Sequence, residues 1–239
     1  MRIRVLKSSR AEVGLILLML CCSFCSCGVT RNATLMQNSS NDVLRTISPL
    51  QPAVRDSLMA IYGNNKIFVE EYLDPTLIAL SYYPELKESP IEFKYSSEAT
   101  TMAARPRPSS MLFNRRYIVV INDREEFEGI HLSQVPFNAQ IGIIGHELAH
   151  VADYQKHNLF GVLGILFRYS NKARKPLFEK EIDRATIERG LGWQLYDWAQ
   201  FILDENNGTT EEYRKFKAEH YLSPTEIEEQ ILFYARYGR

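Results

Sequence analysis

Two histidines that stand four residues apart, His146 and His150, constrain this 239-residue chain more than any other feature. Because an α-helix repeats about every 3.6 residues, both imidazoles would project from one helix face. They would be close enough to share a tetrahedral metal ion. Glu147 lies between them and would flank the metal without ligating it. That is the position of a general base acting on water that the metal activates.

The surrounding residues support a helix over roughly 139–156. Apolar residues recur there with helical spacing, and Asn138, which follows a proline, is a candidate N-cap. Gly142 and Gly145 oppose the helix, because each should cost about 1 kcal/mol relative to alanine. We expect that a neighbouring strand or helix approaches the chain closely at these two glycines.

The third ligand is predicted on a second helix, at residues 178–185. Glu179 and Asp183 are four residues apart and would share one face of that helix. A ligating imidazole usually donates its other N–H to a carboxylate, so Glu179 as ligand and Asp183 as acceptor would fill both roles. Glu181 lacks such a partner one turn later, because position 185 is alanine. These ligand types favour zinc, and we expect one zinc ion per chain.

The order His-Glu-x-x-His and then Glu-x-x-x-Asp resembles the gluzincin metallopeptidases, a group that includes thermolysin and the CAAX prenyl proteases. Carried over to this chain, the resemblance implies three zinc ligands, His146, His150 and Glu179. It also implies that Glu147 is the catalytic base of zinc-dependent peptide-bond hydrolysis and that Asp183 orients His146. The substrate would be a peptide or a protein.

Gluzincins also use a His, Tyr or Arg to stabilise the oxyanion, and His220, Tyr221 and Tyr154 are candidates by residue type. Asp153 lies one turn beyond the second histidine, where it would either hydrogen-bond near the metal or be a solvated or capping carboxylate. His157 is one position too late for the third ligand of a metzincin. We therefore place it at the surface or at the helix end.

Upstream, 91–95 alternates like a half-buried strand and 117–121 is typical of a more buried one. Residues 100–105 would be either a short edge strand, able to bind extended peptide by strand addition, or an exposed loop. We expect a zincin-like α+β fold with a small, mostly antiparallel sheet packed on the active-site helix. Additional helices would carry the third ligand and form the C-terminal half.

Further helices are predicted from caps and periodicity. One would begin within 48–51 and end near 62, and another would occupy 66–80. The aromatic stretch 193–202 is interpreted as core. Ser223 begins a capping box ahead of a last helix that extends to about residue 237.

The N-terminus has the layout of a secretory signal peptide, with a basic region, a short apolar run and a cysteine cluster over residues 1–27. Ser26-Cys27-Gly28 resembles a relaxed bacterial lipobox, which predicts lipidation of Cys27, although the other cysteines of the cluster are alternative acceptors. Residues 28–47 are polar and predict a flexible tether, and 48–239 would be the metallopeptidase domain. The protein would then be exported and lipid-anchored in the cell envelope, on the outer membrane or facing the periplasm.

The formal net charge of −1 and the mixing of both signs argue against nucleic acid as a partner. The local basic cluster Arg105, Arg107, Arg115 and Arg116 would favour acidic peptides or simply be a solvated face. The apolar stretch 159–167 is too short to span a bilayer, which takes about 20 residues. We expect it in the core or in a pocket wall, with a dip into the membrane surface as the alternative.

A second class of function is compatible with the same residues. A noncatalytic, zinc-stabilised envelope lipoprotein would bind a protein partner or act in assembly. Glu147 argues against it, because a structural zinc site needs four ligands and no base.

Overall fold

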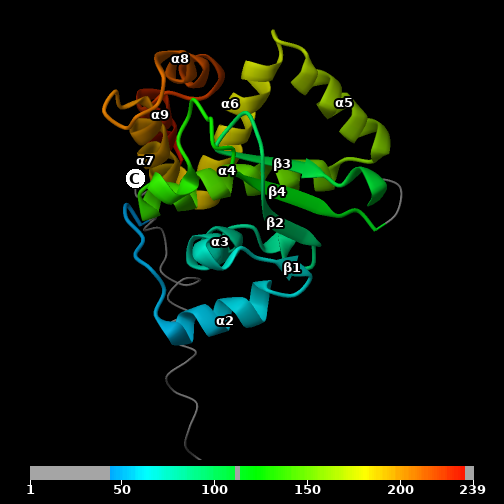
Figure 1. The fold of residues 1–239 in the computed structure, drawn as a ribbon. Coiled ribbons are helices and arrows are strands. Elements are labelled where there is room, and N and C mark those ends of the chain that lie inside the picture. The colour runs from blue at the N-terminus through cyan, green and yellow to red at the C-terminus, as the bar shows by residue number, and fades with distance from the viewer. Residues whose placement is uncertain (1–43, 111–113, 235–239) are drawn as a thin grey trace, which may run out of the picture.

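The computed structural model describes residues 44–110 and 114–234, which form an α+β fold with a small four-stranded sheet (Figure 1). The predicted signal peptide, Cys27 and most of the predicted tether lie outside the described residues. The described chain contains no helix that combines the length and the apolar character needed to cross a membrane.

The sheet has the strand order β1-β2-β4-β3. Its strands are β1 (Lys66–Ile67), β2 (Ile91–Ser96), β3 (Met102–Pro106) and β4 (Tyr117–Asn122). Every residue of β4 is buried, as expected for a strand with a neighbour on each side. β3 lies at the edge of the sheet, so of the two alternatives for this segment the edge strand is correct, over Met102–Pro106 rather than 100–105.

The prediction of a mostly antiparallel sheet is wrong. β1 pairs with β2 and β2 with β4 in parallel, and only β3 and β4 are antiparallel. Parallel neighbours need a crossover connection. Between β1 and β2 this connection contains α3 (Leu73–Ser81), which occupies much of the stretch that we expected to be one helix from residue 66.

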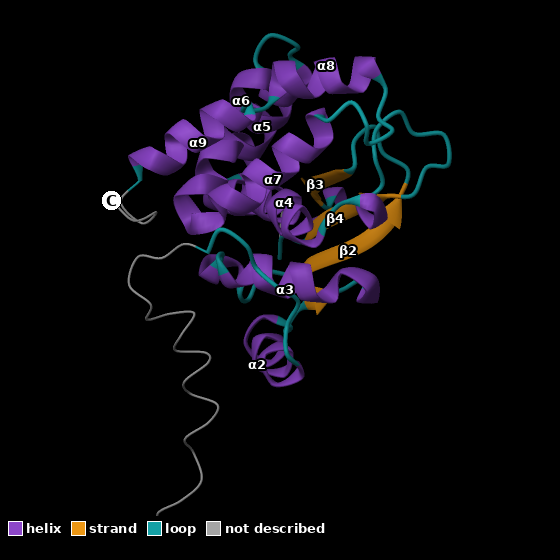
Figure 2. Cartoon of the chain, turned by 90° about the vertical axis from the view of Figure 1, so that its left-hand side faces the viewer, coloured by secondary structure: helices purple, strands orange, loops and turns teal. Residues whose placement is uncertain are grey.

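The central element is α4 (Phe137–Lys156), which confirms the predicted motif helix. It contacts α3, β3, α6 and α7 (Figures 1 and 2). Its N-cap is Pro136, so the prediction for Asn138 is wrong. The Asn138 side chain instead accepts a hydrogen bond from the Ile47 amide at 2.9 Å and donates one to Asp197 at 2.6 Å.

The packed body begins before residue 48, where we expected the tether to end. Ile47 is buried, and Gln194 donates a hydrogen bond of 3.0 Å to the Leu44 carbonyl. Arg45 forms an ion pair of 2.7 Å with Asp197. Residues 44–47 therefore belong to the folded domain.

The remaining helices surround α4 on two sides (Figure 1). α2 (Pro52–Tyr62) and α3 lie on one side, and the C-terminal helices lie on the other. The latter are α6 (Lys175–Thr186), α7 (Gly192–Leu203), α8 (Glu211–His220) and α9 (Pro224–Phe233). The 3-10 turns are Glu70–Tyr72, Pro84–Leu86, Pro108–Ser110 and Leu132–Gln134.

Two local predictions about the C-terminal half are confirmed. Ser223 and Glu226 form both hydrogen bonds of the predicted capping box at the start of α9. In α7, Trp198 and Ile202 are buried, as expected for a core segment. A π-helical turn, Ile187–Leu191, joins α6 to α7, and Gly190 within it has a φ of 105°, which glycine adopts without strain.

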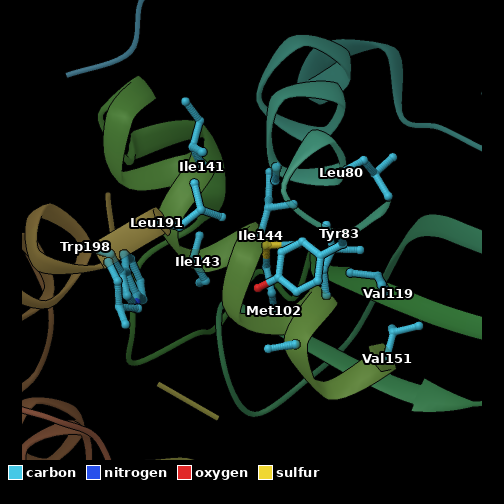
Figure 3. Packing of buried hydrophobic residues seen from close by; sticks show 14 of the residues in the cluster. Leu80, Tyr83, Met102, Val119, Ile141, Ile143, Ile144, Val151, Leu191 and Trp198 are labelled. Atoms are coloured by element: carbon cyan, nitrogen blue, oxygen red, sulfur yellow. The ribbon is translucent and has the colours of Figure 1, made fainter. Parts of the chain in front are cut away.

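The core forms around the buried side chains of α4. In Figure 3, Leu191 and Trp198 lie on one side of Ile144. Leu80 and Tyr83 lie on the other side. Ile144, Leu80 and Tyr83 are at most 1 % exposed. α4 is consequently packed against other elements on both sides, and this packing stabilises it more than its helix propensity does.

The glycines of α4 lie where the prediction required a close neighbour. A Cβ on Gly142 would be 2.2 Å from the Gln194 carbonyl oxygen of α7, and one on Gly145 would be 2.6 Å from Cδ1 of Leu191. The absence of a Cβ at these two positions therefore allows α7 and its preceding turn to approach the motif helix.

α5 (Leu159–Ser170) follows α4 and contacts α6. Val162 and Ile165 are buried, as the core interpretation of this stretch requires. Phe160 and Leu163 are 80 % and 48 % exposed, so that interpretation holds for one face of the helix alone.

Gly142→Ala should lower the free energy of unfolding by roughly 1–3 kcal/mol, because the added methyl would meet backbone atoms of α7. Urea denaturation measures this loss. Gly164→Ala is the matched control in α5, where no atom lies within 4 Å of the added carbon, and it should leave stability unchanged or raise it by up to about 1 kcal/mol. Equal effects of the two substitutions would contradict the close packing of α4 on α7.

Candidate metal centre

α4 presents both motif histidines on one buried face. The His146 and His150 rings have centroids 4.9 Å apart and are about 5 % exposed or less. Their Nε2 atoms each lie 3.2 Å from the same oxygen, Oε2 of Glu179. The side chains thus converge as the i, i+4 spacing predicts.

Glu179 reaches the histidines from α6, the second predicted helix. One donor atom from each of His146, His150 and Glu179 lies within 4.8 Å of the others, and all three residues are buried. These three residues could therefore hold a metal ion, as the sequence predicts. Glu181, the alternative on the same helix, is exposed and does not join the group.

Asp183 connects the centre to the C-terminal half. Nδ1–H of His146 donates to its Oδ1 at 2.8 Å, which is the interaction predicted for this pair. That bond places a proton on Nδ1, so Nε2, which faces Glu179, is the nitrogen that a metal ion would take. The other oxygen, Oδ2, accepts from the Leu222 amide at 2.8 Å. The contact with Leu222 could not be predicted from the sequence, because the donor is a backbone amide, which every residue except proline has.

His150 is held differently. Its Nδ1 is buried and has no hydrogen-bond partner among the described residues. Its ring instead stacks on Tyr154 at 6.2 Å and packs against Phe178 at 5.4 Å. Aromatic packing, rather than a carboxylate at Nδ1, therefore orients this side of the His150 ring.

Asp153 does not pair with His150. Its Oδ1 lies 3.5 Å from Nε2 of His157, and its Oδ2 is buried with no hydrogen-bond partner in the part of the chain that the structure describes. His157 caps the C-terminal end of α4 and is exposed, in agreement with its predicted place at the helix end.

Glu147 is buried beside the three donors and is not one of them. Burial raises the pKa of its carboxyl, while the neighbouring His146 and His150 act in the opposite direction. A raised pKa makes its carboxylate a better proton acceptor than an exposed glutamate. Its position next to the donors is therefore chemically suited to a base.

The candidate oxyanion residues divide into two groups. The Tyr221 ring lies 5.5 Å from that of His146, and Tyr154 stacks on His150. Burial raises the pKa of both phenols, so both remain able to donate a proton in a hydrogen bond. His220 instead donates from Nδ1 to the Phe216 carbonyl at 2.9 Å.

Lys217, which was not predicted from the sequence, is a buried lysine near the three donors. Its Nζ lies 4.1 Å from the Tyr221 ring centroid, and the lysine also lines a cavity of about 20 Å³ with Asp183 and Tyr221. Its burial could have been inferred from the sequence, because Lys217 lies one helical turn after Tyr213 and so on the same face of α8, where an apolar residue would be expected. The Lys217 Nζ thus lies over the face of the Tyr221 ring, in the geometry of a cation–π contact.

The basic cluster near β3 is mostly satisfied within the protein. Arg105 pairs with Glu98, and Arg107 pairs with Glu92 at 3.0 Å. Arg115 donates to the Tyr154 carbonyl at 2.7 Å. Arg105, Arg107 and Arg115 therefore each have a partner within the protein.

The charges of the centre suit a cation. Burial alone would lower the pKa of His146, but hydrogen bonds with Asp183 and Glu179 outweigh it and raise the pKa to about 10. Burial opposes ionisation of Glu179, yet His150 and His146 lower its pKa. Buried carboxylates need a compensating positive charge. A proton on His146 can supply part of it, and a divalent ion held by the three donors would supply more.

No protein-family model matches the chain, and comparisons with curated proteins and with solved structures also give no match.

Glu179→Ala should lower zinc affinity at least about 100-fold, because loss of a ligand exceeds the 10–100-fold effect typical of outer hydrogen-bond partners. Glu181→Ala, on the exposed side of the same helix, is the matched control and should bind zinc like the wild type. Competition with a fluorescent zinc chelator gives both affinities. The reverse result would show that Glu181 is the ligand.

Zinc binding should release a proton from His146, because a ligating imidazole must be neutral and the metal-free residue has a pKa of about 10. Zinc affinity should therefore rise with pH, by up to about tenfold per unit between roughly pH 6 and 8. Titration calorimetry in buffers of different ionisation enthalpy counts the released proton. An affinity that does not change with pH would contradict this protonation state.

Proposed function

We propose that the chain is a zinc-dependent endopeptidase of the bacterial cell envelope. The observation that carries the proposal is the place of Glu147, buried against three metal donors but outside the donor set. A carboxylate in that position is not one of the metal ligands. It is well placed to move a proton.

The number of donors supports catalysis over a purely structural site. Structural zinc is usually closed by four protein ligands, whereas catalytic zinc has three and keeps one position open. Among the described residues, the group consists of His146, His150 and Glu179. The chemistry of this set, two imidazoles and one carboxylate, favours zinc.

Zinc held there would supply Lewis acidity, which polarises a substrate carbonyl and acidifies water. Glu147 would accept the proton of the attacking water and pass it to the leaving amine. Asp183 would keep His146 in the tautomer whose Nε2 is free to ligate. Tyr221 and Tyr154, which contact the ligand rings, are the residues we propose for hydrogen bonding to the oxyanion.

A polypeptide substrate would bind in extended form along β3. This strand lies at the edge of the sheet and contacts α4, the helix that carries Glu147. Strand addition satisfies the backbone groups of an edge and leaves alternate substrate side chains to be selected. The proposed location in the envelope depends on the N-terminal residues 1–27, as interpreted from sequence.

One observation favours a second function. His146, Glu147 and His150 are 4–6 % exposed, so a substrate has little direct access to them. A buried centre of this kind would also suit a noncatalytic envelope protein in which zinc stabilises the fold. The two functions differ in whether Glu147 is needed for a chemical step.

Glu147→Gln should lower kcat/KM for peptide cleavage roughly 10²–10⁴-fold while zinc content stays at one ion per chain. The amide keeps the shape of the side chain but cannot accept the proton. A diverse peptide library with mass-spectrometric readout identifies cleaved bonds, and elemental mass spectrometry measures zinc. Glu181→Gln is the control and should cleave like the wild type.

Each outcome of this experiment is informative. Cleavage that disappears in Glu147→Gln but persists in Glu181→Gln supports the peptidase. Zinc in all three proteins without cleavage in any of them supports the noncatalytic function. A wild-type protein that binds no zinc contradicts both.

A further inference from the structure

α5 has two apolar faces, and one of them is turned to solvent. Val162 and Ile165 are at most 2 % exposed and pack inward. Phe160 and Leu163 are 80 % and 48 % exposed, and Phe167, one turn further, is 65 % exposed. In Figure 1 the helix lies at the outer margin of the molecule, beyond α6. Large apolar side chains gathered on one exposed helix face usually mark a binding surface.

The charged residues along the chain at α5 are all basic. Residues 154–178 contain five lysines and arginines and no aspartate or glutamate. Lys156 precedes the helix, Lys172 and Arg174 follow it, and all three are exposed. The nearest preceding acid, Asp153, is paired with His157. The nearest following one, Glu179, is buried in the metal centre.

A helix with exposed phenylalanine and leucine between basic ends fits an anionic lipid surface. Such helices lie in the plane of the interface, where the apolar side chains enter the lipid and the cations meet the headgroups. α5 has 12 residues, or a length of about 18 Å, which is too short to cross a bilayer. It must therefore lie along the surface rather than through it.

A second copy of the chain fits this face less well. A symmetric dimer joins the same patch of both subunits. Contact through α5 would bring Lys156, Lys172 and Arg174 of one copy close to the same cations of the other, and like charges oppose association. Anionic lipid headgroups supply the opposite charge.

We propose that α5 is a membrane-docking helix that lies on an anionic bilayer, with Phe160 and Leu163 inserted among the lipids. Lys156, Lys172 and Arg174 contact the headgroups. A single lipid chain binds membranes only marginally, and a basic apolar surface provides the second signal that stable attachment requires. The docking helix acts in this way whether or not the metal centre hydrolyses peptides.

The docking helix would also bring the metal centre to the membrane. Tyr169 of α5 packs edge-on against Phe178 at 6.5 Å, and Phe178 contacts His150. One aromatic layer therefore separates the docking helix from a predicted ligand. Polypeptides at the membrane surface are then the class of molecule that the centre would meet.

The test uses the full chain reconstituted with lipid vesicles and the variant Phe160→Trp. Tryptophan emission is measured with brominated phosphatidylcholine, which quenches only side chains that enter the lipid. Phe233→Trp is the matched control, because Phe233 is 73 % exposed on α9, across the molecule from α5 in Figure 1. The wild-type signal of Trp193 and Trp198 is subtracted from both.

Quenching at position 160 should be at least about twofold stronger than at position 233 when phosphatidylglycerol is present. It should fall in purely zwitterionic vesicles and in Phe160→Trp combined with Lys172→Glu and Arg174→Glu. Leu163→Trp gives an independent reading if Phe160→Trp folds poorly. Equal quenching at positions 160 and 233 overturns the proposal. Lipid-independent burial of position 160 that grows with protein concentration also overturns it, in favour of a second copy.

Discussion

The carboxylate of Asp183 is the interaction on which the rest of the site depends. One oxygen accepts from His146 and the other from the Leu222 amide, so a single side chain joins α4, α6 and the segment between α8 and α9. Because Asp183 is 2 % exposed, loss of either partner would leave one buried carboxylate oxygen without that hydrogen bond. The orientation of the candidate metal centre and the attachment of the C-terminal helices therefore depend on the same side chain.

Buried charge explains why the centre is suited to a cation. Glu147, Glu179 and Asp183 are removed from water together with the two histidines, and Lys217 supplies a further positive charge nearby. Burial of ionised groups costs several kcal/mol each unless opposite charges compensate them. A metal ion would replace the proton on His146 and strengthen that compensation. Catalytic and structural uses of zinc share this electrostatic requirement, and Glu147 is the residue that distinguishes them.

Parts of the site and fold were predictable because they depend on local periodicity. The i, i+4 spacing put His146 with His150 and Glu179 with Asp183, and both pairs lie together in the structure. The glycine prediction for α4 succeeded for a related reason, since a helix retains costly glycines where another backbone approaches. The prediction of strand direction failed, because the pattern of residues 91–96 and 117–122 is the same whether the strands are parallel or antiparallel.

By itself, the sequence determined that His146 and His150 share one helix face and that Glu179 and Asp183 share another. That these two faces meet was decided by the tertiary structure. The tertiary structure decided which long-range partners meet those faces, including the Leu222 amide and the buried Lys217. It also decided that Asn138 secures residues 44–47 rather than capping α4, and that Phe160 is exposed while Val162 is not. The physical reason is that periodicity acts over a few residues, whereas burial and backbone hydrogen bonding depend on segments far apart in the chain.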